Sequence, residues 1–269
     1  LRRRLDATRW PDEVEGAGWD YGTSLGYMRT LARYWRHDYD WRRRESVLNR
    51  LPQFMATIDG QRVHFVHQRG KGPSPLPIVI SHGWPGSFVE MRRILPLLTD
   101  PAAHGGDAAD AFDVVIPSLP GVGFTEPARG PGMTPRRIAG LWARLMADLG
   151  YGRYGAQGGD WGSAISLELG LAEPRRVLGI HLNFIAGRFL FGGTISQTPD
   201  DPVARDYLAK LRAWWDSEGG YNHQQGTRPQ TLAFGLADSP AGLAAWIIEK
   251  FRVWSDWKDD FESLFGRDE

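Results

Sequence analysis

Apolar residues follow two alternating periods through the middle of the chain. Short apolar runs indicate strands at residues 63–67, 78–80 and 113–117, and residues 177–184 are expected to form a buried strand. Between them, spacings of three and four indicate a helix that begins after Thr134 and a second helix at residues 163–171. Strands that alternate with helices imply a mostly parallel sheet with right-handed crossovers.

Helical spacing also marks both ends of the chain. Residues 25–35 carry apolar positions three and four apart and predict one amphipathic helix. Beyond residue 184 the strand signal ends, and helical spacing follows at 207–215 and 243–251, which we interpret as a cap inserted after the sixth strand. His181 lies in a predicted strand and is expected in the core. The expected domains are an N-terminal extension (1–75), an α/β core (76–185) and a helical cap (186–269).

Composition narrows the class of protein. The 269 residues are 42% hydrophobic, which is ample for a large core. Lysine plus arginine equal aspartate plus glutamate at 32 each, so no global field favours nucleic acid or an anionic membrane. The given sequence contains no cysteine and no apolar run near the ~18–20 residues of a membrane span, and no signal peptide is visible in it. We expect a soluble cytoplasmic enzyme.

Candidate chemistry begins at Gly158–Gly162, a pattern typical of a nucleophile elbow with aspartate at its centre. Residues 154–157 are a weak strand by propensity and are assigned to one mainly because an elbow requires it. Asp160 is ionised at its ordinary pKa of ~3.9, so it can attack a saturated carbon without a base and form an alkyl-enzyme ester. An aspartate between glycines is also typical of a plain turn or helix cap.

A second pattern, His82–Ser87, follows directly after a predicted strand. A glycine-rich turn there supplies a backbone N–H toward the elbow, so the amides of Trp84 and Trp161 are the candidate oxyanion hole. His82 is expected to brace this loop by hydrogen bonding rather than act as a base. In the cap, Tyr221 is either an interfacial aromatic or a phenol that donates to the oxygen of an opening ether.

These motifs together resemble the microsomal-type epoxide hydrolases. The resemblance rests on His82–Ser87, Pro117–Gly121, Gly158–Ser163, Gly220–Gln224 and Asp238–Pro240, and it extends over nearly the whole chain, including Arg9–Pro11. It implies an α/β-hydrolase fold wrapped by an N-terminal extension and covered by a helical cap. It further implies that Asp160 opens an epoxide to give a vicinal diol, that Trp84 and Trp161 form the oxyanion hole, and that Tyr221 is one of two polarising tyrosines.

The resemblance also implies the partners and the limits of the site. An apolar epoxide and water are the expected partners, with no cofactor, metal, nucleic acid or membrane, and a homodimer as a further expectation. The arginine-rich composition favours the soluble bacterial members over the membrane-anchored animal ones. Phe184, Phe189 and Phe191 are candidate pocket residues. The family places its histidine, the orienting carboxylate and a second tyrosine after the cap.

The chain departs from the family pattern at that point. It ends at Glu269 and starts with leucine inside an expected helix, so we expect it to be part of a longer enzyme, with the C-terminal part of the core outside it. Two alternatives stay open. One is a haloalkane dehalogenase-like hydrolase with the same aspartate, and the other is a catalytically incomplete binding module.

Overall fold

A six-stranded sheet forms the larger part of the structure, with strand order β1-β2-β4-β3-β5-β6. β4, β3, β5 and β6 run parallel, while β1 and β2 add an antiparallel edge. The strands are β1 Gln53–Ile58, β2 Gln61–Gln68, β3 Leu76–Ser81, β4 Phe112–Pro117, β5 Tyr154–Gly158 and β6 Val177–Leu182. The mostly parallel α/β architecture expected from the alternating pattern is therefore confirmed, including the weakly predicted β5.

This computed structural model describes residues 1–185, 200–258 and 260–268. The chain divides into two units, one of Leu1–Trp41 with Ile195–Glu269, the other of Arg42–Thr194, which holds the sheet. Helical segments near and within the second unit are α3 Trp41–Leu48, η1 Phe88–Arg92, α4 Leu95–Thr99, η2 Pro101–His104, η3 Ala108–Asp110, α5 Pro135–Asp148 and α6 Trp161–Ala172. The domain boundaries proposed from the sequence stay predictions.

Alternate side chains of the central strands build a core on each face of the sheet. Val79 and Val115 point to one face, where they join Trp142 and Ile165 of α5 and α6. Their neighbours along the strands point to the other face and pack with the segment that contains η1 and α4, as Ile80, Val114, Ile116, Phe88 and Leu95. A side-chain period of two places successive residues on opposite faces, so β3 and β4 are mostly apolar, with Ser81 and Asp113 as their polar residues.

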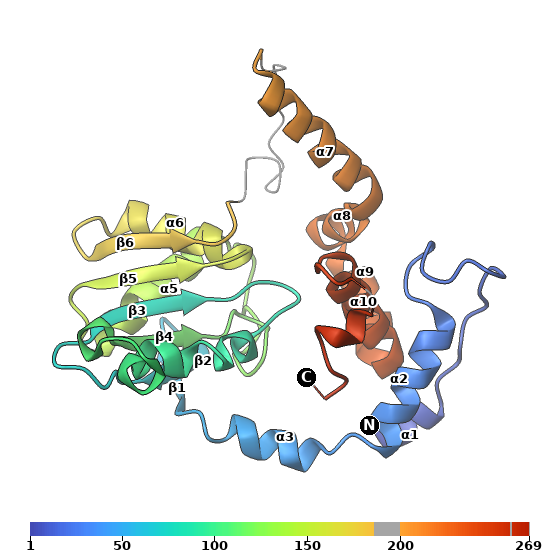
Figure 1. Ribbon diagram of the computed structural model, residues 1–269, viewed down its shortest axis with the longest axis horizontal. Helices are drawn as coiled ribbons and strands as arrows, with labels where there is room; N and C mark the ends of the chain where they lie inside the picture. Colours follow the sequence, from blue (N-terminus) through green and yellow to red (C-terminus); the bar gives the residue numbers. More distant parts are fainter. Residues whose placement is uncertain (186–199, 259, 269) are drawn as a thin grey trace. The chain divides into compact units, whose positions relative to one another are not determined.

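Helices α5 and α6 pack side by side, and α6 also contacts β3, β5 and β6 (Figure 1). The start of α5 agrees with its prediction: the Thr134 hydroxyl accepts from the Arg137 amide, and Pro135 is the first helical residue. Gly150 follows the helix with φ of 87°, the left-handed conformation that favours glycine. Thr134, Pro135 and Gly150 therefore mark both ends of α5, as the sequence predicts.

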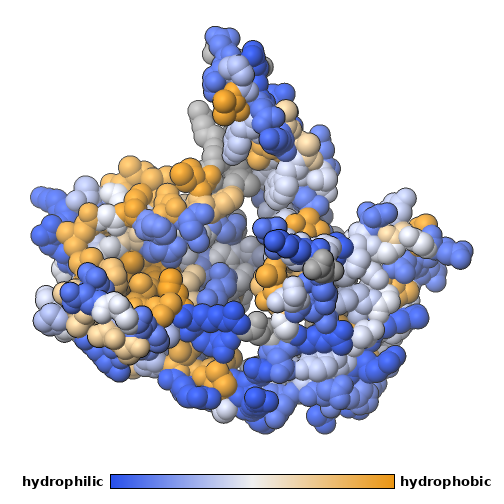
Figure 2. Space-filling model, viewed as in Figure 1, coloured by the Kyte–Doolittle hydropathy of each residue, from blue (hydrophilic) through white to orange (hydrophobic). Residues whose placement is uncertain are grey.

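β6 is the exception to this burial. The strand is present as predicted, but the expectation that it is buried is wrong, because it lies at the edge of the sheet. Leu178 and Ile180 are 45% and 41% exposed, and His181, expected in the core, is exposed as well. Leu167 and Leu171 of α6 are also exposed, and hydrophobic residues gather over β6 and α6 in Figure 2. An apolar run alone predicts a strand, and its depth depends on its place in the sheet.

The described residues of the first unit form helices joined by loops, with no strand among them. Its helices are α1 Arg2–Asp6, α2 Leu25–His37, α7 Pro202–Glu218, α8 Gly220–Thr227, α9 Pro229–Asp238 and α10 Pro240–Val253, with the short turn η5 Phe261–Ser263. The helices predicted at 25–35, 207–215 and 243–251 are confirmed as α2, α7 and α10. The helices α8 and α9 were not predicted, because they are short and contain glycines that interrupt helical spacing.

Most helices in the described ranges are short. No single helix there has the length and apolar content to cross a bilayer, although α9 and α10, bent by 118°, pass that test as a pair by length and composition.

Candidate active site

The elbow lies between β5 and α6, and Asp160 is its strained residue. Asp160 has φ of 51° and ψ of −123°, a backbone conformation that non-glycine residues adopt only at a cost of about 1–3 kcal/mol. The glycines around it are required by close packing. A Cβ at Gly158 would overlap the Gly162 carbonyl, and a Cβ at Gly162 would overlap the Ser81 carbonyl of β3. The turn therefore lifts the carboxylate beside the end of β3.

Backbone amides hold the Asp160 carboxylate. The Trp84 amide donates to Oδ1 at 2.8 Å, and the Trp161 amide also hydrogen bonds to the side chain. Burial raises the pKa of Asp160, and these two amides lower it in part, with burial the larger effect. The structure thus brings together three of the candidate residues named from the sequence, in the arrangement of an aspartate facing two N–H donors.

The turn after β3 is fixed against both the elbow and the loop after β4. A Cβ at Gly83 would overlap the Asp160 side chain, so only glycine fits there. His82 is buried, and its Nδ1 lies 3.0 Å from the Gly83 carbonyl while its Nε2 accepts from the Leu119 amide at 3.1 Å. Both ring nitrogens are thus engaged, which confirms the bracing role predicted for His82. Burial lowers the pKa of this imidazole.

Glu90 is a site residue that the sequence analysis missed. Its carboxylate occupies the space where a side chain at Gly86 would lie, and it hydrogen bonds to the Ser87 backbone. The Ser87 hydroxyl in turn accepts from the Val89 amide, so Ser87 and Glu90 form a capping box at the start of η1. Burial and the charge of Asp160 together raise the pKa of Glu90 to about 6. The Ser-x-x-Glu spacing of residues 87–90 is the sequence signal by which Glu90 could have been found.

The remaining candidates lie elsewhere. Tyr221 belongs to α8 in the first unit, where its ring meets that of Trp254 at a centroid distance of 4.9 Å. Phe184 follows β6 and is 42% exposed. Phe189 and Phe191 lie outside the described residues. The pocket-lining role proposed for these three phenylalanines stays a prediction.

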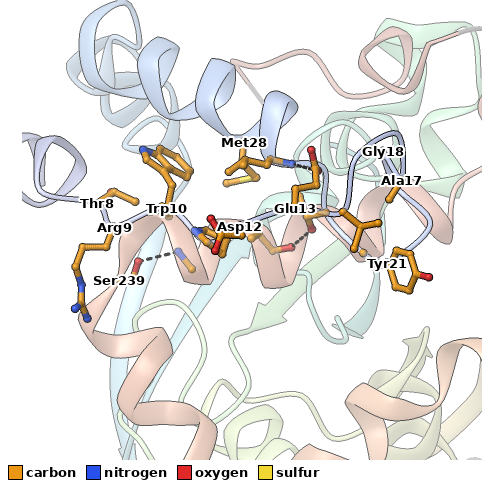
Figure 3. A pocket seen from close by; sticks show the side chains of 18 residues that line it. Thr8, Arg9, Trp10, Asp12, Glu13, Ala17, Gly18, Tyr21, Met28 and Ser239 are labelled. Atoms are coloured by element: carbon orange, nitrogen blue, oxygen red, sulfur yellow. Dashed lines mark hydrogen bonds between the residues drawn. The ribbon is translucent and has the colours of Figure 1, made fainter.

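A cavity of about 440 Å³ lies within the first unit, between the loop of residues 8–23 and the starts of α2 and α10 (Figure 3). Trp10 and Met28 supply apolar walls. Two of its polar groups are engaged within the unit: the Glu13 carboxylate accepts from the Leu25 amide at 2.7 Å, and the Ser239 hydroxyl accepts from the Gly242 amide. Across the described ranges, no three metal-ligating side chains cluster.

Comparison with known proteins agrees with this geometry. A model described as "Epoxide hydrolase N terminus" matches residues 1–91, and one described as "alpha/beta hydrolase fold" matches residues 77–216. A Stigmatella aurantiaca protein, provisionally named an epoxide hydrolase, is 47% identical over 100% of this chain and 60% of its own length. Epoxide hydrolase 1 of Oryctolagus cuniculus is 36% identical over 95% of this chain and 60% of its own.

Solved structures show the same likeness. The structure of Aspergillus niger epoxide hydrolase matches with a TM-score of 0.84 and 28% identity, covering 99% of this chain and 69% of that one. Measured against the two curated relatives from Stigmatella aurantiaca and Oryctolagus cuniculus, the chain spans about 60% of their length.

Proposed function

We propose that this protein, whose chain belongs to the microsomal-type epoxide hydrolase family with the α/β-hydrolase fold, converts an epoxide to a vicinal diol. The observation that carries the proposal is the Asp160 carboxylate, held on a strained turn by the Trp84 amide at 2.8 Å. A carboxylate in this place attacks a saturated carbon and becomes an alkyl ester, whereas a serine would attack a carbonyl carbon and become acylated.

The first step is ring opening. A carboxylate oxygen of Asp160 bonds to one epoxide carbon, the bond between that carbon and the epoxide oxygen breaks, and the electron pair stays on the oxygen. Tyr221, by the family resemblance, hydrogen bonds to that oxygen and transfers its phenolic proton to it, so the oxygen becomes a hydroxyl and the phenolate regains a proton in the second step. The product is an ester between Asp160 and the alkyl group. No cofactor takes part, since both bonds are made and broken between substrate, side chain and water.

The second step is hydrolysis of that ester. Water adds to the ester carbonyl, and the negative charge on its oxygen is stabilised by the amides that already bind the Asp160 carboxylate. The bond between the acyl carbon and the alkyl oxygen then breaks, which frees the Asp160 carboxylate and the diol; of the two water protons, one goes to the departing diol oxygen and the other returns to the Tyr221 phenolate. An activated water requires a base, and His82 is not available for this task because both of its ring nitrogens are engaged. The base is proposed to be the histidine that the family places after its cap.

The substrate proposed is an apolar epoxide, with Phe184 among the residues that line its pocket. A cytoplasmic location and a homodimer are further parts of the proposal. The absence of cysteine agrees with a reducing compartment.

Intact-mass spectrometry tests the first step directly. The protein is incubated with 1,2-epoxybutane and sampled over time, and a covalent adduct of one epoxide per chain is expected. Asp160→Asn should give no adduct, because an amide is a poor nucleophile. Asp148→Asn is the matched control: it removes the same charge from an exposed side chain paired with Arg144 and should leave adduct formation intact. An adduct that persists in Asp160→Asn contradicts the proposal, and halide release from 1-chlorobutane would favour the dehalogenase alternative.

A further inference from the structure

Lys250 of α10 is a buried cation without a function in the steps above. It is 6% exposed, and a lysine is rarely this buried unless its charge is paired. Its Nζ lies 2.7 Å from Glu249 Oε2 and 3.3 Å from Glu218 Oε2, so two carboxylates from α10 and α7 compensate the charge. These ion pairs explain how the ammonium is tolerated, and its position relative to nearby rings indicates a further role.

The same ammonium lies over two aromatic rings. It is 5.2 Å from the centroid of the Tyr221 ring and 5.4 Å from that of Trp254, both within the range of cation–π attraction. The two rings also contact each other edge to face. Tyr221, the candidate hydrogen-bond donor, therefore lies against both an aromatic ring and a buried positive charge, each contributed by the first unit.

The sign of the electrostatic effect on Tyr221 follows from these charges. A cation near a phenol stabilises negative charge on its oxygen, and nearby carboxylates oppose it. With Lys250 in place the group of three charges sums to −1, and without it to −2. Loss of the ammonium makes the potential at the phenol more negative at any geometry, so the phenol becomes a weaker donor to an oxygen that gains charge.

We propose that Lys250 is a positioning residue that makes Tyr221 a stronger hydrogen-bond donor to the opening epoxide. This inference rests on the proposed function, because it assigns Tyr221 the donor role. Lys250 acts through the tyrosine ring and touches neither the substrate nor Asp160 in this scheme. Glu218 and Glu249 hold the ammonium in place and limit its effect.

The rate of adduct formation with two epoxides tests this role. The alkoxide from 1,2-epoxybutane is more basic than that from 1,1,1-trifluoro-2,3-epoxypropane, so ring opening of the first depends more on the donor. Lys250→Met should slow adduct formation with 1,2-epoxybutane about tenfold, a part of the ~10²–10⁴ that general acids contribute, and slow the trifluoro compound much less. Lys250→Arg keeps the charge and should restore most of the rate with both.

Control variants separate this role from a structural one. Lys210→Met removes an exposed lysine paired with Asp206 on α7 and should leave both rates unchanged. Equal slowing of both epoxides by Lys250→Met would indicate a merely structural lysine and overturn the inference, as would a wild-type rate. If circular dichroism shows that Lys250→Met does not fold, Glu218→Gln decides: it should speed 1,2-epoxybutane about two- to threefold, and an equal or lower rate overturns the inference.

The outcome for the wild-type protein separates the two proposals. Failure of wild type to form any adduct contradicts the proposed function itself, and the role of Lys250 with it. Adduct formation that requires Asp160 but is indifferent to Lys250 overturns only the role of the lysine.

Discussion

The elbow and the tyrosine-bearing helices hold their candidate residues by different means. Asp160 is placed by backbone: a turn between β5 and α6, glycines with no room for a Cβ, and the Trp84 and Trp161 amides. Tyr221 is placed by side chains, namely the ring of Trp254 and the ammonium of Lys250. Backbone placement leaves little freedom, whereas a side-chain cluster depends on long, rotatable groups.

This difference explains why the two regions differ in how readily the sequence reveals them. A backbone device needs particular residue types at fixed spacing, and Gly158–Gly162 carries that spacing within five residues. A side-chain cluster joins residues far apart in sequence, such as Glu218 and Lys250, and any of several residue types would serve there. The elbow is therefore expected to fail under small substitutions and the cluster under changes of charge.

The largest effect is expected from Gly162→Ala. Its Cβ would overlap the Ser81 carbonyl, a backbone group that cannot rotate away, so the elbow and the end of β3 must separate. We expect a loss of about 3 kcal/mol or more in the free energy of unfolding. The gain of up to ~1 kcal/mol in helix propensity from alanine is smaller and does not offset it. Urea denaturation followed by circular dichroism measures the change.

Gly155→Ala is the matched control in the same strand-turn-helix segment. A Cβ at Gly155 meets its nearest atom at 3.7 Å, an ordinary contact, so stability should change little. Equal destabilisation by the two substitutions would show that the segment tolerates a methyl group at neither glycine, and that the contact with Ser81 is not what makes Gly162 necessary.

The same contrast sets how much of the fold and site the sequence could predict. The strands β2 to β6, the helices α5 and α6 and the pairing of Trp84 with Asp160 follow local rules of periodicity, capping and turn chemistry, and the structure contains them. β6 was expected to be buried, because an apolar run does not say which strand is central. Glu90 was missed although Ser87 and Glu90 are three apart, because a capping box reads as local structure and its closeness to Asp160 is set by the fold.

A second, smaller effect is expected from Glu90→Gln, which concerns charge inside the backbone-built region. The pKa of Glu90 is raised from 4.5 to about 6, so the folded state holds a proton that the unfolded state has released. Between these pH values the unfolding free energy of wild type should fall as pH rises by about 1–1.5 kcal/mol, because Glu90 is also exposed to solvent and screening reduces the ~2 kcal/mol that the full shift would give. Glutamine does not ionise, so Glu90→Gln avoids this fall in unfolding free energy. At pH 7 the variant should be more stable than wild type by about the same number of kcal/mol.

Urea denaturation at several pH values checks the Glu90 prediction. The stability difference between Glu90→Gln and wild type should grow from near zero at pH 4.5 to its full value above pH 6. Glu15→Gln, at an exposed position, should run parallel to wild type throughout. A stability gain of the same size at every pH would mean that burial of Glu90 does not disfavour its charge.

The smallest effect is expected from Ser239→Ala in the side-chain-built region. The Ser239 hydroxyl accepts from the Gly242 amide at 3.0 Å and caps α10, the helix that carries Lys250. Loss of an N-cap costs about 1 kcal/mol, and a cost of this size should appear as faster amide hydrogen exchange in α10 with little change in α6. Ser217→Ala is the control: Ser217 is exposed within α7, its hydroxyl bonds back to the Trp214 carbonyl, and alanine there should be neutral. Faster amide hydrogen exchange in α6 as well would show that the elbow depends on α10. The elbow would then not be fixed by its own backbone alone, and it would no longer differ in this respect from Tyr221, which neighbouring side chains hold.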